Sequence, residues 1–187
     1  MPFTVVYDAN VLYPAHLRDL LLTLAQAGEF RARYTAEILD EVFEHILENR
    51  PDLNSEKLAR TRELMERAIP DVLVTGHMTL VDSLELPDPD DRHVLAAAIV
   101  AGAELIVTHN IKDFPAEALE PYGVEAQNPD VFVHHLVDLR PGIVVRAVET
   151  MSGRLRNPRL SIDELIALIE RDGLVQSMLA LRQVLGH

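Results

Sequence analysis

Short apolar runs alternate with amphipathic helical patterns over the first two thirds of the chain. The β-branched and aromatic run at residues 3–7 predicts a buried strand, the run at 105–107 predicts another, and residues 72–74 are strand-like. Helical patterns occur at residues 17–27, from Thr35 to just before Pro51, from Asn54 or Ser55 to Pro70, and from near Pro89 to Gly102. This alternation is typical of an α/β fold with a mostly parallel sheet.

The last third of the chain has a helical pattern. Ser161 and Glu164 have the spacing of a capping box ahead of a run of apolar helical positions. Gly173 is expected to end that helix, and a last helix is expected to reach Leu185. We therefore expect an α/β domain at residues 1–128 and a helical C-terminal extension at residues 129–187.

The composition is that of a globular protein, and it limits the possible metal chemistry. Apolar residues make up 48% of the chain and charged residues 25%. The chain has no cysteine, so any metal ion must bind to oxygen or imidazole ligands. No apolar stretch approaches the roughly 20 residues that cross a bilayer, and the first residues lack the basic start of a signal peptide. We expect a cytoplasmic protein with no membrane partner.

The net charge of −13 bears on nucleic-acid binding. Residues 129–187 carry seven acidic and seven basic side chains, so the whole acidic excess lies in residues 1–128. Phosphate binding normally relies on Lys and Arg, and the charge therefore argues mildly against RNA as a ligand. A cluster of carboxylates that binds cations would account for part of the excess.

Four acidic residues follow the predicted strands or lie on helices beside the same edge of the sheet: Asp8, Glu41, Asp91 and Asp113. In an open parallel sheet, ligands bind beyond the carboxyl ends of the strands. Mg²⁺ takes oxygen ligands and uses one or two carboxylates together with water and substrate phosphate. Because such a site can hydrolyse phosphodiesters, these acids are the first candidates for catalysis and metal binding.

Each of these acids also has a structural explanation that the sequence leaves open. Asp8 can be a turn residue after a strand, and Glu41 can be a solvated helix residue. Asp91 suits the positive end of a helix dipole in a first turn that Asp88 caps. Asp113 can cap a short helix that follows it.

Other catalytic motifs are absent from the sequence. No pair of histidines has the spacing of zinc ligands on a helix, so His45, His93 and His109 are interpreted as surface residues or as residues behind the metal ligands. There is no glycine-rich nucleotide loop and no nucleophile elbow. The acidic residues remain as the candidates for chemistry.

Three segments resemble the successive motifs of PIN-domain nucleases, and most closely those of VapC-like toxins. They read VVYDANVLYP at residues 5–14, ILDEVFEHI at 38–46 and DPDDRHVLAAAIVAGAELIVTHNIKDF at 88–114. The third is the most diagnostic, because an acid, an alanine-rich helix, a buried strand and Thr-x-Asn-x-x-Asp follow in order. The resemblance spans about residues 3–128 and implies a three-layer PIN-like α/β fold.

The resemblance also implies roles for single residues. Asp8 matches the first aspartate of the family, Glu41 the glutamate of the helix, and Asp91 the aspartate ahead of the alanine-rich helix. Many relatives have a fourth acid where this chain has Asn110, and the nearest carboxylate is that of Asp113. Either Asn110, through its carbonyl oxygen, or Asp113 completes the site under this interpretation.

By the same resemblance, the four acids bind Mg²⁺ or Mn²⁺ and the protein is an endoribonuclease that hydrolyses RNA. Thr108 is expected to orient the acidic network through its hydroxyl. Similar toxins are held inactive by a cognate antitoxin and often form homodimers, so both partners are expected here.

The extension contains a compact basic patch, formed by Arg154, Arg156 and Arg159. Such a patch suits RNA phosphates or the acids of an antitoxin, and equally an ordinary solvated surface. Two further functions stay open. One is a non-catalytic PIN-like module that binds RNA or protein, which Asn110 and the acidic surface favour. The other is a receiver-like protein phosphorylated on aspartate, against which Ala9 stands where receivers have a second acid.

Overall fold

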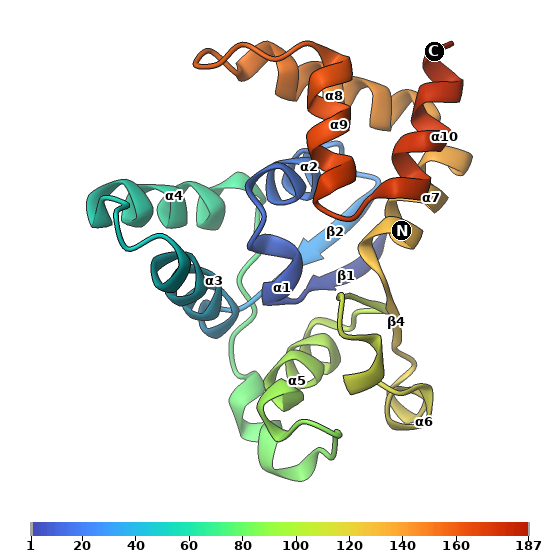
Figure 1. Cartoon of the computed structure of the whole chain (residues 1–187). Helices are drawn as coiled ribbons and strands as arrows, with labels where there is room; N and C mark the ends of the chain where they lie inside the picture. The colour runs from blue at the N-terminus through green and yellow to red at the C-terminus, as the bar shows by residue number, and fades with distance from the viewer. Residues whose placement is uncertain (1, 187) are drawn as a thin grey trace.

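The computed structural model describes residues 2–186 and is built around one four-stranded sheet (Figure 1). The strands are β1 (Phe3–Tyr7), β2 (Phe30–Arg33), β3 (Leu105–Val107) and β4 (Glu125–Gln127). Their order is β2-β1-β3-β4, and every neighbouring pair is parallel. The α/β class and the parallel sheet predicted from the sequence are confirmed.

The register of β1 and β3 places two polar residues at the same edge of the sheet. Tyr7 pairs with Val107, so Asp8 and Thr108 are the next residues along the two strands. The Asp8 amide donates to the Val107 carbonyl at 3.1 Å, and the Thr108 amide donates to the Gln127 carbonyl at 3.0 Å. β1 and β3 consist mostly of buried apolar residues, as expected for strands of a parallel sheet that is covered on both faces.

Helices cover the two faces of the sheet and give the three layers that the resemblance implied (Figure 1). On one face, α5 (Arg92–Ala101) packs against β1 and β3. On the other face, α2 (Ala15–Gln26) packs against β2, and the Tyr7 hydroxyl donates to the Leu21 carbonyl at 3.0 Å. A short helix, α1 (Ala9–Leu12), follows β1 directly and packs against α3 (Ala36–Asn49).

The predicted helix caps are present on α3 and on α4 (Ser55–Ala68). The Thr35 hydroxyl accepts from the Ile38 amide at 3.0 Å, and Asn54 accepts from the Glu56 amide at 2.8 Å. Short elements complete the domain: η1 (His77–Ser83), η2 (Pro89–Asp91), η3 (Ile111–Asp113), α6 (Ala116–Leu119) and η4 (Glu120–Tyr122).

The C-terminal segment forms four helices on the α2 side of the sheet (Figure 1). They are α7 (Pro129–Leu139), α8 (Pro141–Arg154), α9 (Ile162–Arg171) and α10 (Val175–Leu185). The predicted capping box is present, with the Glu164 amide donating to Ser161 at 3.2 Å and the Ser161 amide donating to Glu164 at 2.8 Å. α8 and α9 pack against α2, and their buried residues join the core of the α/β domain.

The structure corrects several local predictions. Residues 72–74 form no strand, because only Leu73 makes a single bridge, to Tyr34. Asp113 does not cap a helix: α6 begins after Pro115 and has no side-chain cap. The helix expected from Pro89 starts with the 3-10 turn η2 and becomes α-helical at Arg92. Within residues 2–186, no helix has the length and apolar character needed to span a bilayer.

Candidate active site

Asp8 is the most buried acid at the edge where the strands end, with 3% of its surface exposed. Its Oδ1 accepts from the Ala9 amide at 2.7 Å and so caps α1. Its Oδ2 accepts from the Thr108 hydroxyl at 2.7 Å and from the Asn10 amide group at 2.8 Å. Burial raises the pKa of Asp8, although the hydrogen bonds from Thr108 and Ala9 oppose the shift. The carboxylate is therefore held in one orientation.

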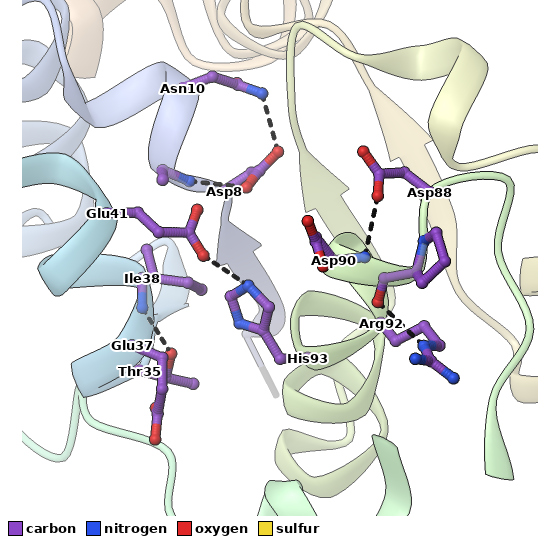
Figure 2. Close-up of polar contacts among 12 residues, drawn as sticks. Asp8, Asn10, Thr35, Glu37, Ile38, Glu41, Asp88, Asp90, Arg92 and His93 are labelled. Atoms are coloured by element: carbon purple, nitrogen blue, oxygen red, sulfur yellow. Dashed lines mark hydrogen bonds and ion pairs between the residues drawn. The ribbon is translucent and has the colours of Figure 1, made fainter. Parts of the chain in front are cut away.

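Asn10 and Thr108 form the frame that holds Asp8. Figure 2 shows the contact of Asn10 with Asp8. The Asn10 amide also donates to the Thr108 hydroxyl at 3.0 Å, and its carbonyl oxygen accepts from the His109 amide at 3.0 Å. Thr108 is fully buried, and its Oγ1 accepts from the Asn110 amide at 3.0 Å. The network joins residues about a hundred positions apart in the chain and ties the ends of β1 and β3 together.

Asp91 lies in the short turn ahead of α5, and its Oδ2 is buried without a hydrogen-bond partner. The pKa of Asp91 is raised to about 7. Burial is the main cause, followed by the negative charges of Asp8, Asp88, Asp113 and Glu41. Asp8, Asp113 and Glu41 therefore lie within electrostatic range of Asp91, and the four predicted acids face the same edge of the sheet.

Glu41 faces this cluster from α3, but one of its oxygens is already engaged. Its Oε1 lies 2.7 Å from Nε2 of His93, which is on the first turn of α5 (Figure 2). Burial lowers the pKa of His93, but the hydrogen bond and charge of Glu41 outweigh this effect, and the pKa is raised overall. The glutamate is therefore paired with an imidazole beside the acidic cluster.

Asp113, on η3, is the carboxylate candidate for the fourth position. Its charge contributes to the raised pKa of Asp91. Asn110, at the start of the same turn, donates its backbone amide to Thr108, and its backbone carbonyl accepts from the Asp113 amide at 3.0 Å. Of these two candidates, Asp113 supplies negative charge next to Asp91, and Asn110 shapes the backbone between Thr108 and Asp113.

Asp88 has the capping role that its position beside Pro89 suggested. Its side chain accepts from the Asp90 amide at 2.9 Å at the start of η2 (Figure 2).

Tyr13 also lies beside the acidic cluster. Burial and then the charges of Glu41, Asp8, Asp91 and Glu48 raise its pKa to about 12. Its ring stacks on His45, with the centroids 4.0 Å apart.

The chemistry of the donor set fits a hard divalent cation. The clustered groups are all carboxylates, Asp91 has a buried oxygen with no partner, and its pKa is high because the negative charges repel one another. Among residues 2–186, however, no three acidic or imidazole side chains lie close enough together to hold a metal ion.

The C-terminal segment reaches this edge of the sheet through the turn between α9 and α10. Asp172 Oδ2 accepts from the Leu17 amide at 3.3 Å and lies 3.8 Å from Nδ1 of His16. Gly173, with a φ of +106°, has the His109 ring beside it. Because the His109 amide donates to Asn10, this turn packs directly behind the frame that holds Asp8.

The predicted basic patch is divided in the structure. Arg154 donates to Asp19 at 2.8 Å and to Thr23 at 2.7 Å, and so anchors the end of α8 to α2. Arg156 and Arg159 are exposed in the following loop. Arg156 and Arg159 are therefore free to contact RNA or a protein partner while Arg154 keeps its ion pair with Asp19.

Sequence reasoning missed two contacts of the acids, that of Asn10 with Asp8 and that of His93 with Glu41, although it did interpret His93 as a surface residue or one behind the metal ligands. Asn10 carries a weak signal, because an amide two residues after an aspartate at a strand end can turn back towards it. The pairing of His93 with Glu41 carries no local signal, since the partners lie on helices separated by about fifty residues. Both contacts depend on the tertiary structure.

Comparison with known proteins gives two family matches that follow one another along the chain. A model described as PIN domain matches residues 4–112, and a model described as VapC50 C-terminal domain matches residues 129–183. A protein of Mycobacterium tuberculosis (strain H37Rv) named "Putative ribonuclease VapC50" is 55% identical over 49 residues. That match covers 26% of this chain and 29% of the relative, which is less than a third of either protein.

No solved structure gives a significant match to the chain. The PIN-domain model nevertheless covers more than half of the 187 residues and includes three of the four clustered acids. The resemblance found in the sequence motifs is thus confirmed, and the chain belongs to the PIN-domain family, with a C-terminal segment like that of VapC50.

Proposed function

We propose that this protein is an endoribonuclease that depends on Mg²⁺ or Mn²⁺ and acts as the toxin of a toxin–antitoxin pair. The observation that carries the proposal is the cluster of Asp8, Glu41, Asp91 and Asp113 at the carboxyl edge of the sheet, with the unpartnered oxygen of Asp91 among them. Membership of the PIN-domain family and the ribonuclease name of the partial relative support the same activity.

Each acid has a distinct part in the proposed site. Asp8 presents a carboxylate whose direction is fixed by Thr108 and Asn10, so little reorganisation is needed when a ligand arrives. Asp91 offers an oxygen without a competing donor, and Glu41 and Asp113 complete the ligand set. Asp91 also has to lose its proton near neutral pH before it can act as an anionic ligand.

When bound, a divalent cation supplies positive charge beside the reacting phosphate and activates water for attack. On the side of the site that faces the sheet, Thr108 and the carboxylate of Asp8 are buried and exclude water from the bound cation. The excess negative charge explains why the acidic edge needs a cation before a phosphodiester can approach.

A set of matched variants tests the assignment of the acids. Cleavage of purified RNA in Mg²⁺ is expected to disappear with Asp8→Asn and Asp91→Asn, and to fall strongly with Glu41→Gln and Asp113→Asn. Glu44→Gln, on the same helix as Glu41 but outside the cluster, is the control and should cleave like the wild type. Full activity of Asp91→Asn would refute the proposed centre.

Non-catalytic binding is the second candidate function. Asn110 stands where many relatives have an acid, and no three acidic or imidazole side chains within residues 2–186 lie close enough together to hold a metal ion. A folded wild-type chain that binds RNA without cleaving it, with or without Mn²⁺, would favour this function over the nuclease.

The toxin role, the partners and the cellular location are proposals that rest on the resemblance. We propose a cognate antitoxin, a homodimer and action in the cytoplasm. Induced expression in bacteria should arrest growth, while Asp8→Asn should not, and light scattering should give the mass of a dimer. Growth arrest by Asp8→Asn would show that the toxicity does not depend on nuclease activity.

A further inference from the structure

We infer that His93 is a positioning residue that holds Glu41 in the acidic cluster and thereby strengthens binding of the divalent cation. This inference rests on the proposed function and deepens it, because it assigns a role to a residue outside the set of acids. The contact that carries it joins two helices on opposite sides of the site. Nε2 of His93 on α5 lies 2.7 Å from Oε1 of Glu41 on α3 (Figure 2).

Glu41 needs such a partner because other forces favour its movement into water. The side chain is long and 44% exposed, so a fixed rotamer costs conformational entropy. It also faces the negative charges of Asp8 and Asp91, which repel it. A single strong contact at Oε1 opposes both effects and leaves Oε2 available to a cation or its water.

The imidazole is itself fixed in place. The His93 side chain is only 12% exposed, and its Nδ1 is buried without a hydrogen-bond partner. Nε2 can carry a proton towards Glu41 in the imidazolium and in one neutral tautomer, so the contact exists without any change in charge state. His93 is also two residues beyond Asp91, so the turn ahead of α5 supplies one acid and the first turn of α5 supplies the support of another.

The chain contains a second glutamate–histidine contact outside the cluster, a longer one in which neither ring nitrogen of the histidine has a hydrogen bond. Glu37, one turn before Glu41 on α3, lies 3.3 Å from Nε2 of His77 at the start of η1. The exposures are similar: 43% for the Glu37 side chain and 3% for that of His77. This pair links the same helix to the segment that packs on α5, but its carboxylate does not contribute to the raised pKa of Asp91.

The test measures Mn²⁺ affinity by isothermal titration calorimetry on the full, nucleic-acid-free chain. His93→Ala is expected to weaken Mn²⁺ binding about ten-fold, the lower end of the effect of residues behind metal ligands. His93→Gln retains an amide donor near the position of Nε2 and is expected to recover most of the affinity. His77→Ala, the control, should lower the melting temperature but leave the affinity within about two-fold of wild type.

A double-mutant cycle shows whether His93 acts through Glu41. In the Glu41→Gln background, His93→Ala should cause little further loss of Mn²⁺ affinity, because the residue that it positions is already altered. RNA cleavage at saturating Mn²⁺ should recover in His93→Ala more than in Glu41→Gln, since the ligand itself is retained.

Three results would overturn the inference. They are an unchanged Mn²⁺ affinity in folded His93→Ala, an equal loss in His77→Ala, and an undiminished effect of His93→Ala in the Glu41→Gln background. A wild-type chain that binds no Mn²⁺ would remove the proposed function together with the inference. If wild type and His93→Ala both bound Mn²⁺ normally, the inference about His93 would fail while the proposed function would stand.

Discussion

The hydroxyl of Thr108 donates to Oδ2 of Asp8 at 2.7 Å, although the two residues are one hundred positions apart. The bond is possible because β1 and β3 are adjacent and end in register. It couples the stability of the sheet to the orientation of the central acid of the candidate site.

Replacement of Thr108 by valine tests this coupling. Valine keeps the shape but removes the hydroxyl, so a buried carboxylate oxygen of Asp8 loses a donor and the amides of Asn10 and Asn110 lose an acceptor. The free energy of unfolding is expected to fall by about 2 kcal/mol, which chemical denaturation can measure. Thr150→Val, in which an exposed hydroxyl bonds within its own helix, is the control and should change little. Equal stabilities of the two variants would contradict the buried bond.

The raised pKa of Asp91 predicts a dependence of stability on pH in the metal-free protein. Its pKa is about 7 in the folded state and near the ordinary 3.8 in the unfolded chain. Between these values the folded state keeps a proton that the unfolded state releases, so the contribution of Asp91 to stability is lost as the pH rises. Asp91→Asn should therefore raise the melting temperature in EDTA at pH 8 more than at pH 4.5.

Asp82→Asn provides the comparison for that pH series, because Asp82 is an exposed residue of η1. It should shift the melting temperature by a small amount that does not grow with pH. If Asp91→Asn gave the same shift at pH 4.5 and pH 8, the carboxylate would have an ordinary pKa, and the electrostatic account of the cluster would fail.

Divalent cations should stabilise the folded protein. Binding to the folded state alone contributes about 2.7 kcal/mol when the free ion is at one hundred times its dissociation constant. Mn²⁺ is therefore expected to raise the melting temperature of the wild type and of Glu44→Gln, and to have little effect on Asp8→Asn. A rise of the same size in Asp8→Asn would place the ion elsewhere.

The capping box of α9 gives a prediction for the C-terminal segment. Ser161→Ala removes the acceptor for the Glu164 amide and is expected to cost about 1 kcal/mol of stability. The reciprocal bond from the Ser161 amide to the Glu164 carboxylate lowers the pKa of Glu164, so the contribution of that bond is present above the ordinary value of 4.5 and is lost as the pH falls. Ser161→Ala keeps this backbone donor. Because α8 and α9 share the core of the α/β domain, one cooperative transition should shift as a whole. Two separate transitions would contradict the shared core.

Much of the fold could be predicted because its signals are local. Phe3–Tyr7 and Leu105–Val107 are continuous apolar strands, and Thr35, Asn54 and Ser161 are caps that the sequence spells out. β2 and β4 could not be predicted in this way. β2 reads FRAR, with arginines between its buried positions, and β4 consists of Glu125, Ala126 and Gln127, so neither has the apolar pattern of a central strand.

The candidate site divides in the same manner. The acids could be proposed because each lies in a recognisable motif: Asp8 and Asp113 follow strands, Asp91 precedes a helix, and Glu41 lies within one. The contacts between Asn10 and Asp8, and between His93 and Glu41, could not, because they depend on how β1, β3, α3 and α5 meet in space. Sequence patterns thus indicated which groups are candidates for the chemistry, while the structure indicated which neighbours contact them.

The most direct test of the central claim is cleavage of total bacterial RNA by the purified, folded chain, free of any partner, in Mg²⁺ and in EDTA. We expect discrete fragments in Mg²⁺, no cleavage in EDTA, recovery when Mg²⁺ is restored, and no cleavage by Asp8→Asn. Intact RNA under every condition, or fragments that persist in EDTA and with Asp8→Asn, would contradict a metal-dependent nuclease centred on Asp8.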